Sequence, residues 1–237
     1  MKKMLLKIKI AMNLLSEKGP NLAKSKRLFA DEIDFSVKLL TIADTHNKLS
    51  IKGAINNLPE SSEYDLCILL GDISRGDIEI LLKYIPKDKM MGILGNHDDK
   101  DNLLRYNIKN INKTLFNFNG INFIGLEGCI KYKENQPGYK QDEIRQVCRL
   151  MPKAHILISH NIPYGFMGEL NEAHIGAKEI NKYLLKKRVP LNICGHNHSD
   201  KQGKLKNGTI VIETNMIRLI NISPKGIIVN KIETGIY

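Results

Sequence analysis

The chain has 237 residues and a mass of 26.9 kDa, a length that suits one large domain or two small ones. Hydrophobic residues make up 42% of the sequence and charged residues 26%, which is close to globular averages and argues against disorder, collagen-like repeats and coiled coils. No stretch approaches the run of about 18 uncharged apolar residues that a membrane span needs, so no integral membrane segment is expected.

The net charge is +11, from 36 Lys and Arg residues against 25 Asp and Glu residues. An excess of this size permits attraction to phosphate-rich partners. Lysine outnumbers arginine, however, and no basic cluster is interleaved with aromatic residues, as it would be in a site for single-stranded nucleic acid. The charge therefore keeps nucleic acid only as an alternative partner.

Residues 1–36 differ in character from the rest of the chain. Apolar residues recur at helical spacing over 4–15, with lysines on the opposite face, and predict an amphipathic helix. Gly19-Pro20 ends this helix, and a second short helix is predicted over 22–30. We interpret residues 1–36 as an N-terminal helical extension that docks on one domain formed by residues 37–237.

Two features favour a cytoplasmic location. Lys7 and Lys9 interrupt what would be the apolar core of a secretion signal, and no small-x-small cleavage site follows. No C-x-x-C pair occurs, so the cysteines are expected to be buried thiols in a reducing compartment. They are Cys67, Cys129, Cys148 and Cys194.

From residue 37 onward, short apolar runs alternate with segments of helical spacing, a pattern typical of an α/β domain with parallel strands. The runs predict strands at Val37–Ala43, Asp65–Leu70, Met91–Leu94, Ile121–Leu126, His155–Ser159 and Leu191–Cys194. The intervening segments predict helices at Ile51–Leu58, Ile78–Ile85, Gln141–Met151 and Ala177–Lys187. The end of the chain predicts an antiparallel meander of Thr209–Glu213, Arg218–Ile222 and Gly226–Ile232.

Polar side chains follow five of these predicted strands at the point where each strand ends. The motifs are Asp44-Thr45-His46, Gly71-Asp72, Gly95-Asn96-His97-Asp98, His160 and Gly195-His196-Asn197-His198. In open α/β sheets, ligands bind beyond the carboxyl ends of the strands. Burial of so many polar groups is costly unless a cation compensates it, so the pattern indicates a metal site.

The ligand types narrow the choice of metal. Imidazole and carboxylate groups without a thiolate suit Mn, Fe, Zn, Ni or Co. Seven candidate ligands exceed what one ion can use while it keeps a position open for substrate. Two ions that share one carboxylate fit the count, and Asp72 is the best candidate for the bridge because it stands alone after its strand.

The order D-x-H, G-D, G-N-H-D, H and G-H-x-H resembles the calcineurin-like metallophosphoesterase superfamily over residues 37 to about 200. Gly-Asp alone carries no weight, whereas G-N-H-D is a much stronger signal, and five motifs in order make coincidence negligible. Gly125-Leu126-Glu127-Gly128 and the segment 158–163 are similar to the small bacterial-type phosphoesterases of this group.

The resemblance implies a four-layer α/β sandwich in which α-helices flank two mixed central β-sheets. It also implies two ligand sets, with manganese favoured as the metal. One ion would be held by Asp44, His46, Asp72 and His198, and the other by Asp72, Asn96, His160 and His196. His97 would act on the substrate as a catalytic group, with Asp98 orienting its ring.

Two further residues are weaker candidates for substrate binding. Gly71-Asp72-Ile73-Ser74-Arg75-Gly76 is one residue shorter than the G-D-x-x-D-R-G motif of the protein phosphatases, so Arg75 need not reach the phosphate. His174 is a candidate for lining the substrate cleft, with a surface role at a helix start as the alternative.

The function implied is that of a dinuclear metal-dependent phosphoric ester hydrolase acting on a small phosphoester through a hydroxide that bridges the two ions. A nuclease or cyclic-nucleotide phosphodiesterase on the same site is the alternative. A non-catalytic scaffold is a third hypothesis, less favoured because such a protein is expected to have lost ligands and every expected position is filled here.

Overall fold

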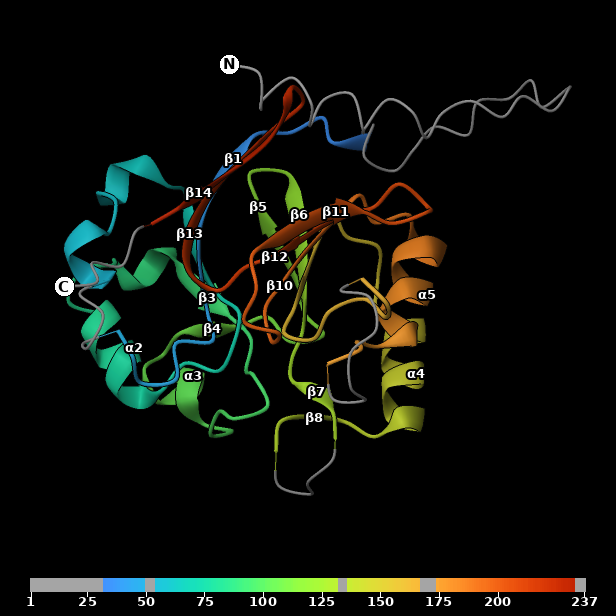
Figure 1. The fold of residues 1–237 in the computed structure, drawn as a ribbon, viewed down its shortest axis with the longest axis horizontal. Coiled ribbons are helices and arrows are strands. Elements are labelled where there is room, and N and C mark those ends of the chain that lie inside the picture. Colours follow the sequence, from blue (N-terminus) through green and yellow to red (C-terminus); the bar gives the residue numbers. More distant parts are fainter. Residues whose placement is uncertain (1–31, 50–53, 132–135, 167–173, 233–237) are drawn as a thin grey trace, which may run out of the picture.

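A computed structural model describes residues 32–49, 54–131, 136–166 and 174–232 (Figure 1). The two helices predicted within residues 1–30 lie outside the described residues. Ile33 is 8% exposed and belongs to the same apolar core as Val37.

Two six-stranded sheets form the centre of the molecule. The first has the order β14-β13-β1-β2-β3-β4, with β1 at Val37–Ala43, β2 at Leu66–Leu69, β3 at Met90–Gly92, β4 at Lys109–Asn110, β13 at Met216–Ser223 and β14 at Gly226–Lys231. The second has the order β11-β12-β10-β9-β6-β5, with β5 at Leu115–Phe118, β6 at Ile121–Leu126, β9 at Ile156–Ser159, β10 at Leu191–Cys194, β11 at Lys201–Lys204 and β12 at Ile210–Glu213. β7 (Cys129–Ile130) and β8 (Gly138–Tyr139) form a separate parallel pair.

Both sheets are mixed. In the first, β1 to β4 are parallel and β13 is antiparallel to β1 and to β14. In the second, β6, β9, β10 and β12 are parallel, and β5 and β11 are antiparallel edge strands. The polar ends of β1, β2 and β3 therefore share one edge of their sheet, and those of β9 and β10 share one edge of the other.

Helices flank the two sheets (Figure 1). α2 (Arg75–Leu81), α3 (Asn102–Arg105) and the 3-10 turns η2 (Ala54–Asn57), η3 (Ser61–Glu63) and η4 (Lys87–Lys89) belong to the half of the first sheet. α4 (Gln141–Leu150) and α5 (Lys178–Lys187) belong to the half of the second. Among the described residues, no helix combines the length and the apolar composition needed to cross a membrane.

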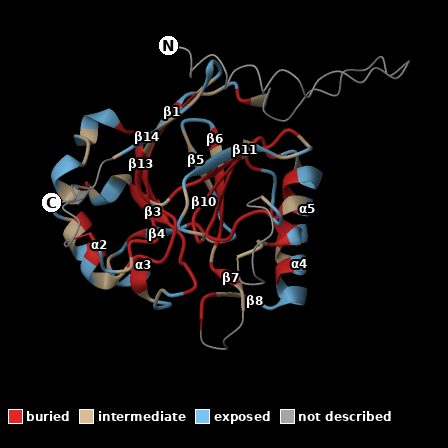
Figure 2. Ribbon diagram, viewed as in Figure 1, coloured by how far each residue is buried: buried red, intermediate tan, exposed pale blue. Residues whose placement is uncertain are grey.

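Three apolar layers separate these four structural layers. Leu39 of β1 packs with Phe123 of β6 between the sheets, whereas the next residue, Leu40, packs with Ile78 of α2 on the outer face. A third cluster joins the second sheet to α4 and α5 and includes Ile144. Figure 2 shows the buried residues concentrated in the strands. The predicted four-layer fold class is confirmed.

Most predicted elements match the structure within a few residues, and the helices differ most. α2 begins at Arg75, three residues earlier than predicted, because the hydroxyl of Ser74 accepts a hydrogen bond from the Asp77 amide at 3.1 Å and caps the helix. It ends at Leu81 rather than at Ile85. Of the helix predicted over 51–58, the described residues form only the 3-10 turn η2.

The predicted C-terminal meander is wrong in one of its two pairings. β13 and β14 pair as predicted, but β12 lies in the other sheet, parallel to β10, and β13 pairs with β1 in register Val37↔Ile222. Strands β10 and β12 are buried along almost their whole length, so β12 is more favourably placed inside a sheet than at the edge of a hairpin.

The loops after β2 and β3 approach each other closely. Gly71 has a φ of +95°, and a Cβ built on it would lie 2.2 Å from the Gly95 amide nitrogen. A Cβ on Gly95 would in turn lie 2.0 Å from Oδ1 of Asp72. Both glycines are therefore required by contact between two loops that carry candidate ligands.

We predict that Gly71→Ala lowers the free energy of unfolding by more than Gly120→Ala does. Gly120 has a similar φ of +85° but nothing within 4 Å of its Cβ position, so its substitution costs only the left-handed conformation, about 1–2 kcal/mol. Gly71→Ala adds overpacking against backbone, about 1–3 kcal/mol more. Urea unfolding in EDTA measures both, and equal losses would contradict the close approach.

Candidate metal centre

The five predicted motifs meet at one place, between the carboxyl ends of the two sheets. Two groups of three residues each offer one ligand atom within 4.8 Å of the others. The first group is Asp44, His46 and His198, and the second is Asp44, Asp72 and His160. These residues come from four different loops, and Asp44 belongs to both groups.

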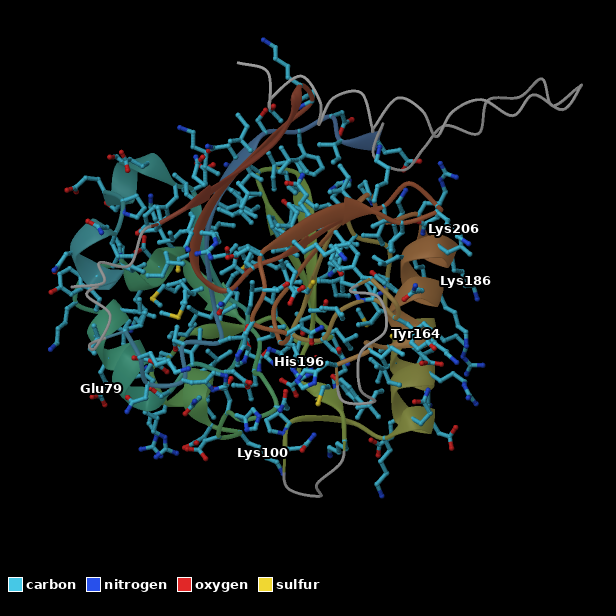
Figure 3. All side chains as sticks on the ribbon, viewed as in Figure 1. Glu79, Lys100, Tyr164, Lys186, His196 and Lys206 are labelled. Atoms are coloured by element: carbon cyan, nitrogen blue, oxygen red, sulfur yellow. The ribbon has the colours of Figure 1, made fainter. Side chains whose placement is uncertain are left out.

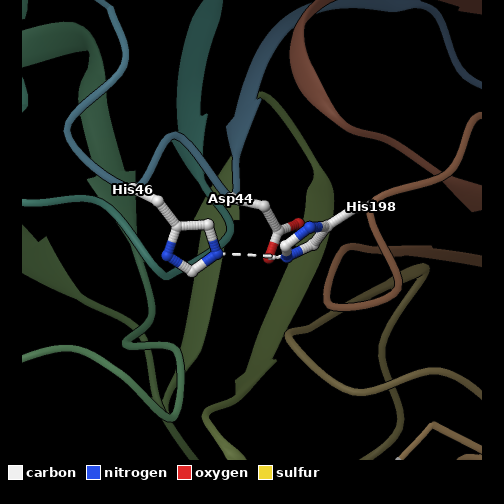
Figure 4. Close-up of side chains that lie close together, drawn as sticks. All are labelled: Asp44, His46 and His198. Atoms are coloured by element: carbon white, nitrogen blue, oxygen red, sulfur yellow. Dashed lines mark hydrogen bonds and ion pairs between the residues drawn. The ribbon is translucent and has the colours of Figure 1, made fainter.

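In the first group, two imidazoles face each other beside a carboxylate (Figure 4). Nε2 of His46 lies 3.1 Å from Nε2 of His198, and the latter lies 3.8 Å from Oδ1 of Asp44. The His198 side chain is 49% exposed, whereas the Asp44 side chain is fully buried. The group is therefore open to solvent on its histidine side.

Asp72 lies between the two groups. Its Oδ2 atom is 3.8 Å from Nε2 of His46 and 3.5 Å from Nε2 of His160. One carboxylate oxygen is thus near a histidine from each predicted ligand set, as a bridging residue would be. Asp44, which sequence reasoning assigned to one ion only, also lies close to members of both sets.

Asn96 and His196 complete the cluster around His160. Oδ1 of Asn96 is 3.0 Å from Nε2 of His160, and the rings of His160 and His196 lie 5.0 Å apart. The other ring nitrogen of His160 contacts the Leu70 carbonyl oxygen at 2.8 Å and so fixes the ring orientation.

The donor set fits divalent cations. Asp44 is only 2% exposed, and its buried Oδ1 atom accepts no hydrogen bond from the described residues. Leaving such an oxygen unpaired is costly, and a bound cation removes the cost. Nitrogen and oxygen donors without a thiolate match the metals expected from the sequence.

The backbone at these ligands is strained. Asp44, His46, Asp72, His196 and His198 have φ values between 44° and 79°, in the left-handed region that non-glycine residues rarely adopt. Such conformations persist only where the surroundings enforce them, and they cluster at functional sites.

The charges of the cluster perturb its pKa values. Burial would raise the pKa of Asp72, but the neighbouring His160 imidazole and the His97 amide outweigh it and lower this pKa. Burial would lower the pKa of His160, but Asp72 and Asp44 raise it to about 9. For His46, burial dominates and lowers the pKa. His160 is therefore protonated at neutral pH when no cation is bound, and His46 is neutral.

The Asp98 carboxylate lies against backbone amides and not, as expected, against the His97 ring. Instead of contacting the His97 ring, its carboxylate accepts hydrogen bonds from the backbone amides of Gly95 (2.7 Å), Asp72 (2.8 Å) and Ile73 (2.9 Å). Burial and the nearby charge of Asp72 raise its pKa to about 7. Asp98 thus ties the loop after β2 to the loop after β3.

His97 lies at the open side of the centre. The residue is exposed, its amide donates to Oδ1 of Asp72 at 2.8 Å, and its ring is 5.7 Å from that of His46. This placement leaves the imidazole free to meet a molecule bound at the centre.

The two weaker candidates differ in their surroundings. The Arg75 guanidinium lies 2.9 Å from Asp99 and 3.1 Å from Asp101, so its charge is compensated at the start of α3. The His174 ring stacks on that of His196, with 5.3 Å between centroids. His174 therefore borders the centre, and Arg75 is held by acidic neighbours.

Sequence reasoning missed the residues that hold the loop after β10. Arg218 is 3% exposed, and its Nε donates to Asp200 at 2.7 Å. The Asn215 side chain donates to the His198 carbonyl oxygen at 3.1 Å, and Ser199 donates to Glu213 at 2.8 Å. A single arginine inside an apolar strand was the one signal that could have indicated this support.

The sequence profile of the calcineurin-like phosphoesterase family matches residues 37–200, which is more than half of the chain. The chain belongs to the calcineurin-like phosphoesterase family. It matches no curated protein at a significant level.

Solved structures with the same fold accompany this family match. The crystal structure of TT1561 from Thermus thermophilus superposes with a TM-score of 0.56 at 12% identity, covering 84% of this chain and 100% of that one. A phosphopantetheinyl hydrolase from Mycobacterium tuberculosis gives 0.54 at 12% identity over 76% and 89% of the chains. A 5'-nucleotidase from Candida albicans gives 0.53 at 11% identity over 81% of this chain and 50% of that one. At these identities the likeness shows the fold of calcineurin-like phosphoesterases.

We predict that cation binding releases about one proton from His160 at pH 7, because a histidine ligand must be neutral and the pKa of this one is about 9 without the cation. The apparent affinity for Mn²⁺ should then rise about tenfold per pH unit between pH 7 and 8.5. Calorimetry in buffers of different ionisation enthalpy counts the protons.

The same shift predicts the stability of the cation-free protein. Since the pKa of His160 is raised from 6.5 to about 9 in the folded state, its stabilising contribution is complete below pH 6.5 and is lost as the pH rises through about 9. Urea unfolding of the cation-free protein as a function of pH measures this loss. An affinity for Mn²⁺ that does not depend on pH, together with no proton release on binding, would contradict the raised pKa of His160 on which both predictions rest.

Proposed function

We propose that the chain is a metal-dependent phosphoester hydrolase with two divalent cations at this centre, Mn²⁺ being the favoured ion. One set of ligands would be Asp44, His46, Asp72 and His198, and the other Asp72, Asn96, His160 and His196. The supporting observation is that two groups of carboxylates and imidazoles from separate loops meet around Asp44, whose buried Oδ1 atom accepts no hydrogen bond from the described residues.

When bound, two such cations would lower the pKa of water held between them and neutralise charge on the phosphoryl oxygens. The side chains of the protein itself supply the other functions that the reaction needs. His46 and His198 keep one side of the centre open to solvent, where a phosphoester can enter. Hydrolysis there would form a bond from a water oxygen to phosphorus and break the bond from phosphorus to the alcohol oxygen, which would leave with a proton.

His97 is proposed as the catalytic group on the substrate side. It is exposed at the mouth of the centre, and its backbone is fixed by the hydrogen bond to Asp72. From that position its imidazole can donate a hydrogen bond to the phosphoryl group or a proton to the leaving oxygen. Asp98 is proposed to position the loop of His97 rather than its ring.

Because Asp72 and His97 lie at different places in the centre, we predict that substitution of Asp72 impairs cation binding and substitution of His97 impairs turnover. Asp72→Asn should remove or scramble the bound cations, because this carboxylate lies near histidines of both sets. His97→Ala should lower kcat about 100-fold or more while the cation content stays close to that of the wild type. Elemental analysis of the purified variants, with turnover measured on one aryl phosphate, separates the two. Equal cation loss in both variants would contradict the assigned roles.

A substrate panel tests the reaction class and its alternative. Phosphomonoesters, linear and cyclic phosphodiesters and single-stranded DNA are offered with Mn²⁺, Ni²⁺, Co²⁺, Zn²⁺ or Mg²⁺. Hydrolysis of small monoesters without DNA cleavage supports the small-molecule esterase, and preferential cleavage of diesters supports a nuclease or cyclic-nucleotide phosphodiesterase. Cation binding without hydrolysis of any ester would indicate a scaffold.

A further inference from the structure

A cavity of about 340 Å³ is lined in part by Leu94 and Lys100, which flank the segment of Asn96 and His97, and its size is within the range of small-molecule sites. Most of its lining side chains are polar, so the cavity suits a polar ligand rather than an apolar one; they are Lys100, Asn110, Asn112, Glu127, Lys131 and Gln136.

Backbone hydrogen bonds join this cavity to the metal centre. The Gly128 amide donates to the Leu94 carbonyl oxygen at 2.8 Å, two residues before Asn96, and the His160 amide donates to the Leu126 carbonyl oxygen at 3.1 Å. Glu127 therefore lies on a segment held between the loops that carry two candidate ligands. The cavity wall and the metal centre therefore draw on neighbouring segments of the same loops.

Two buried oxygen atoms in the cavity wall accept no hydrogen bond within the described part of the chain, although the Glu127 carboxylate also interacts with Asn110. They are Oε2 of Glu127 and Oε1 of Gln136, and Gln136 is only 7% exposed as a residue. The amide nitrogen of Gln136 is used, since it contacts Sγ of Cys129 at 3.5 Å. An unpaired buried acceptor is costly, so a ligand that brings N–H or O–H donors is favoured here.

The wall also carries two positive charges. Lys100 and Lys131 line the cavity, and neither lies within 4 Å of a carboxylate oxygen of another described residue, although Lys131 attracts the Glu127 carboxylate from farther away. Figure 3 shows Lys100 at the same end of the molecule as His196 of the metal centre. Two lysines beside unpartnered acceptors suit a group that is anionic and also donates hydrogen bonds.

We propose that this cavity is the leaving-group subsite, and that the substrate is the phosphate ester of a sugar or nucleoside that carries a second phosphate. Hydroxyl or amino groups of the alcohol pair with Glu127 and Gln136, and the second phosphate lies against Lys100 and Lys131. The inference rests on the proposed phosphoesterase activity. Aryl and lipid alcohols lack these groups and leave the acceptors unpaired.

The test compares three esters in the presence of Mn²⁺. They are adenosine 3',5'-bisphosphate, fructose 1,6-bisphosphate and p-nitrophenyl phosphate, the last of which has neither the donors nor the second anion. The wild type should hydrolyse at least one bisphosphate with a higher kcat/KM than the aryl ester. Which of the two is preferred distinguishes a nucleoside from a sugar.

Substitutions in the cavity wall then test whether its side chains cause the preference for bisphosphates over the aryl ester. Lys100→Ala with Lys131→Ala, and separately Glu127→Gln, should each lower the ratio of kcat/KM for the bisphosphate to that for the aryl ester by about tenfold or more, chiefly through KM. Lys87→Ala with Lys225→Ala is the matched control for charge. Lys87 precedes β3, and Lys225 lies in the turn that follows β13, beside the amino end of β1. This control should keep the ratio within about twofold.

The outcomes separate the two proposals. If the aryl ester is hydrolysed and the ratio of kcat/KM for the bisphosphate to that for the aryl ester is unchanged in every wall variant, the proposed subsite is overturned. The proposed phosphoesterase activity then still stands. An equal loss on all three esters would show that the wall is structural, and would also overturn the subsite. Failure of the wild type on all three esters despite bound Mn²⁺ would remove the proposed function and the subsite with it.

Discussion

The structure depends on one arrangement, the packing of two buried carboxylates against imidazoles that come from distant parts of the chain. Asp44 and Asp72 are almost fully buried, and His46, His160 and His198 surround them at 3.5–3.8 Å. Burial of these charges is unfavourable without compensation, and the parallel strands alone do not supply it. In the cation-free protein the protonated His160 supplies part of this compensation, and under the proposed function two cations would supply the rest.

The support around these ligands explains how the loops keep left-handed conformations. Asp98 links the loops after β2 and β3 through three backbone amides, and Arg218 holds Asp200 beside the loop after β10. Neither residue is placed to ligate a cation. Positioning groups of this kind fix ligand geometry from rigid elements, which a metal centre requires.

The sequence predicted the elements that are buried on both faces. β1, β6 and β10 have the predicted bounds because each is a mainly apolar and mostly buried run. The motifs after β1, β2, β3, β9 and β10 converge because parallel strands end at one edge. β4 and β11 were missed because they are short, polar edge strands. The passage of the chain from β12 to the other sheet, the role of Asp98 and the second contact of Asp44 depend on tertiary packing, which local patterns do not contain.

The central claim is that these side chains enclose two neighbouring cations. Anomalous diffraction from crystals of the protein grown with Mn²⁺ tests it most directly. We expect two peaks about 3.5–4 Å apart, with an Asp72 oxygen between them and Asn96 beside one of them. A single peak, or peaks away from the carboxyl ends of β1, β2 and β10, would contradict the dinuclear centre.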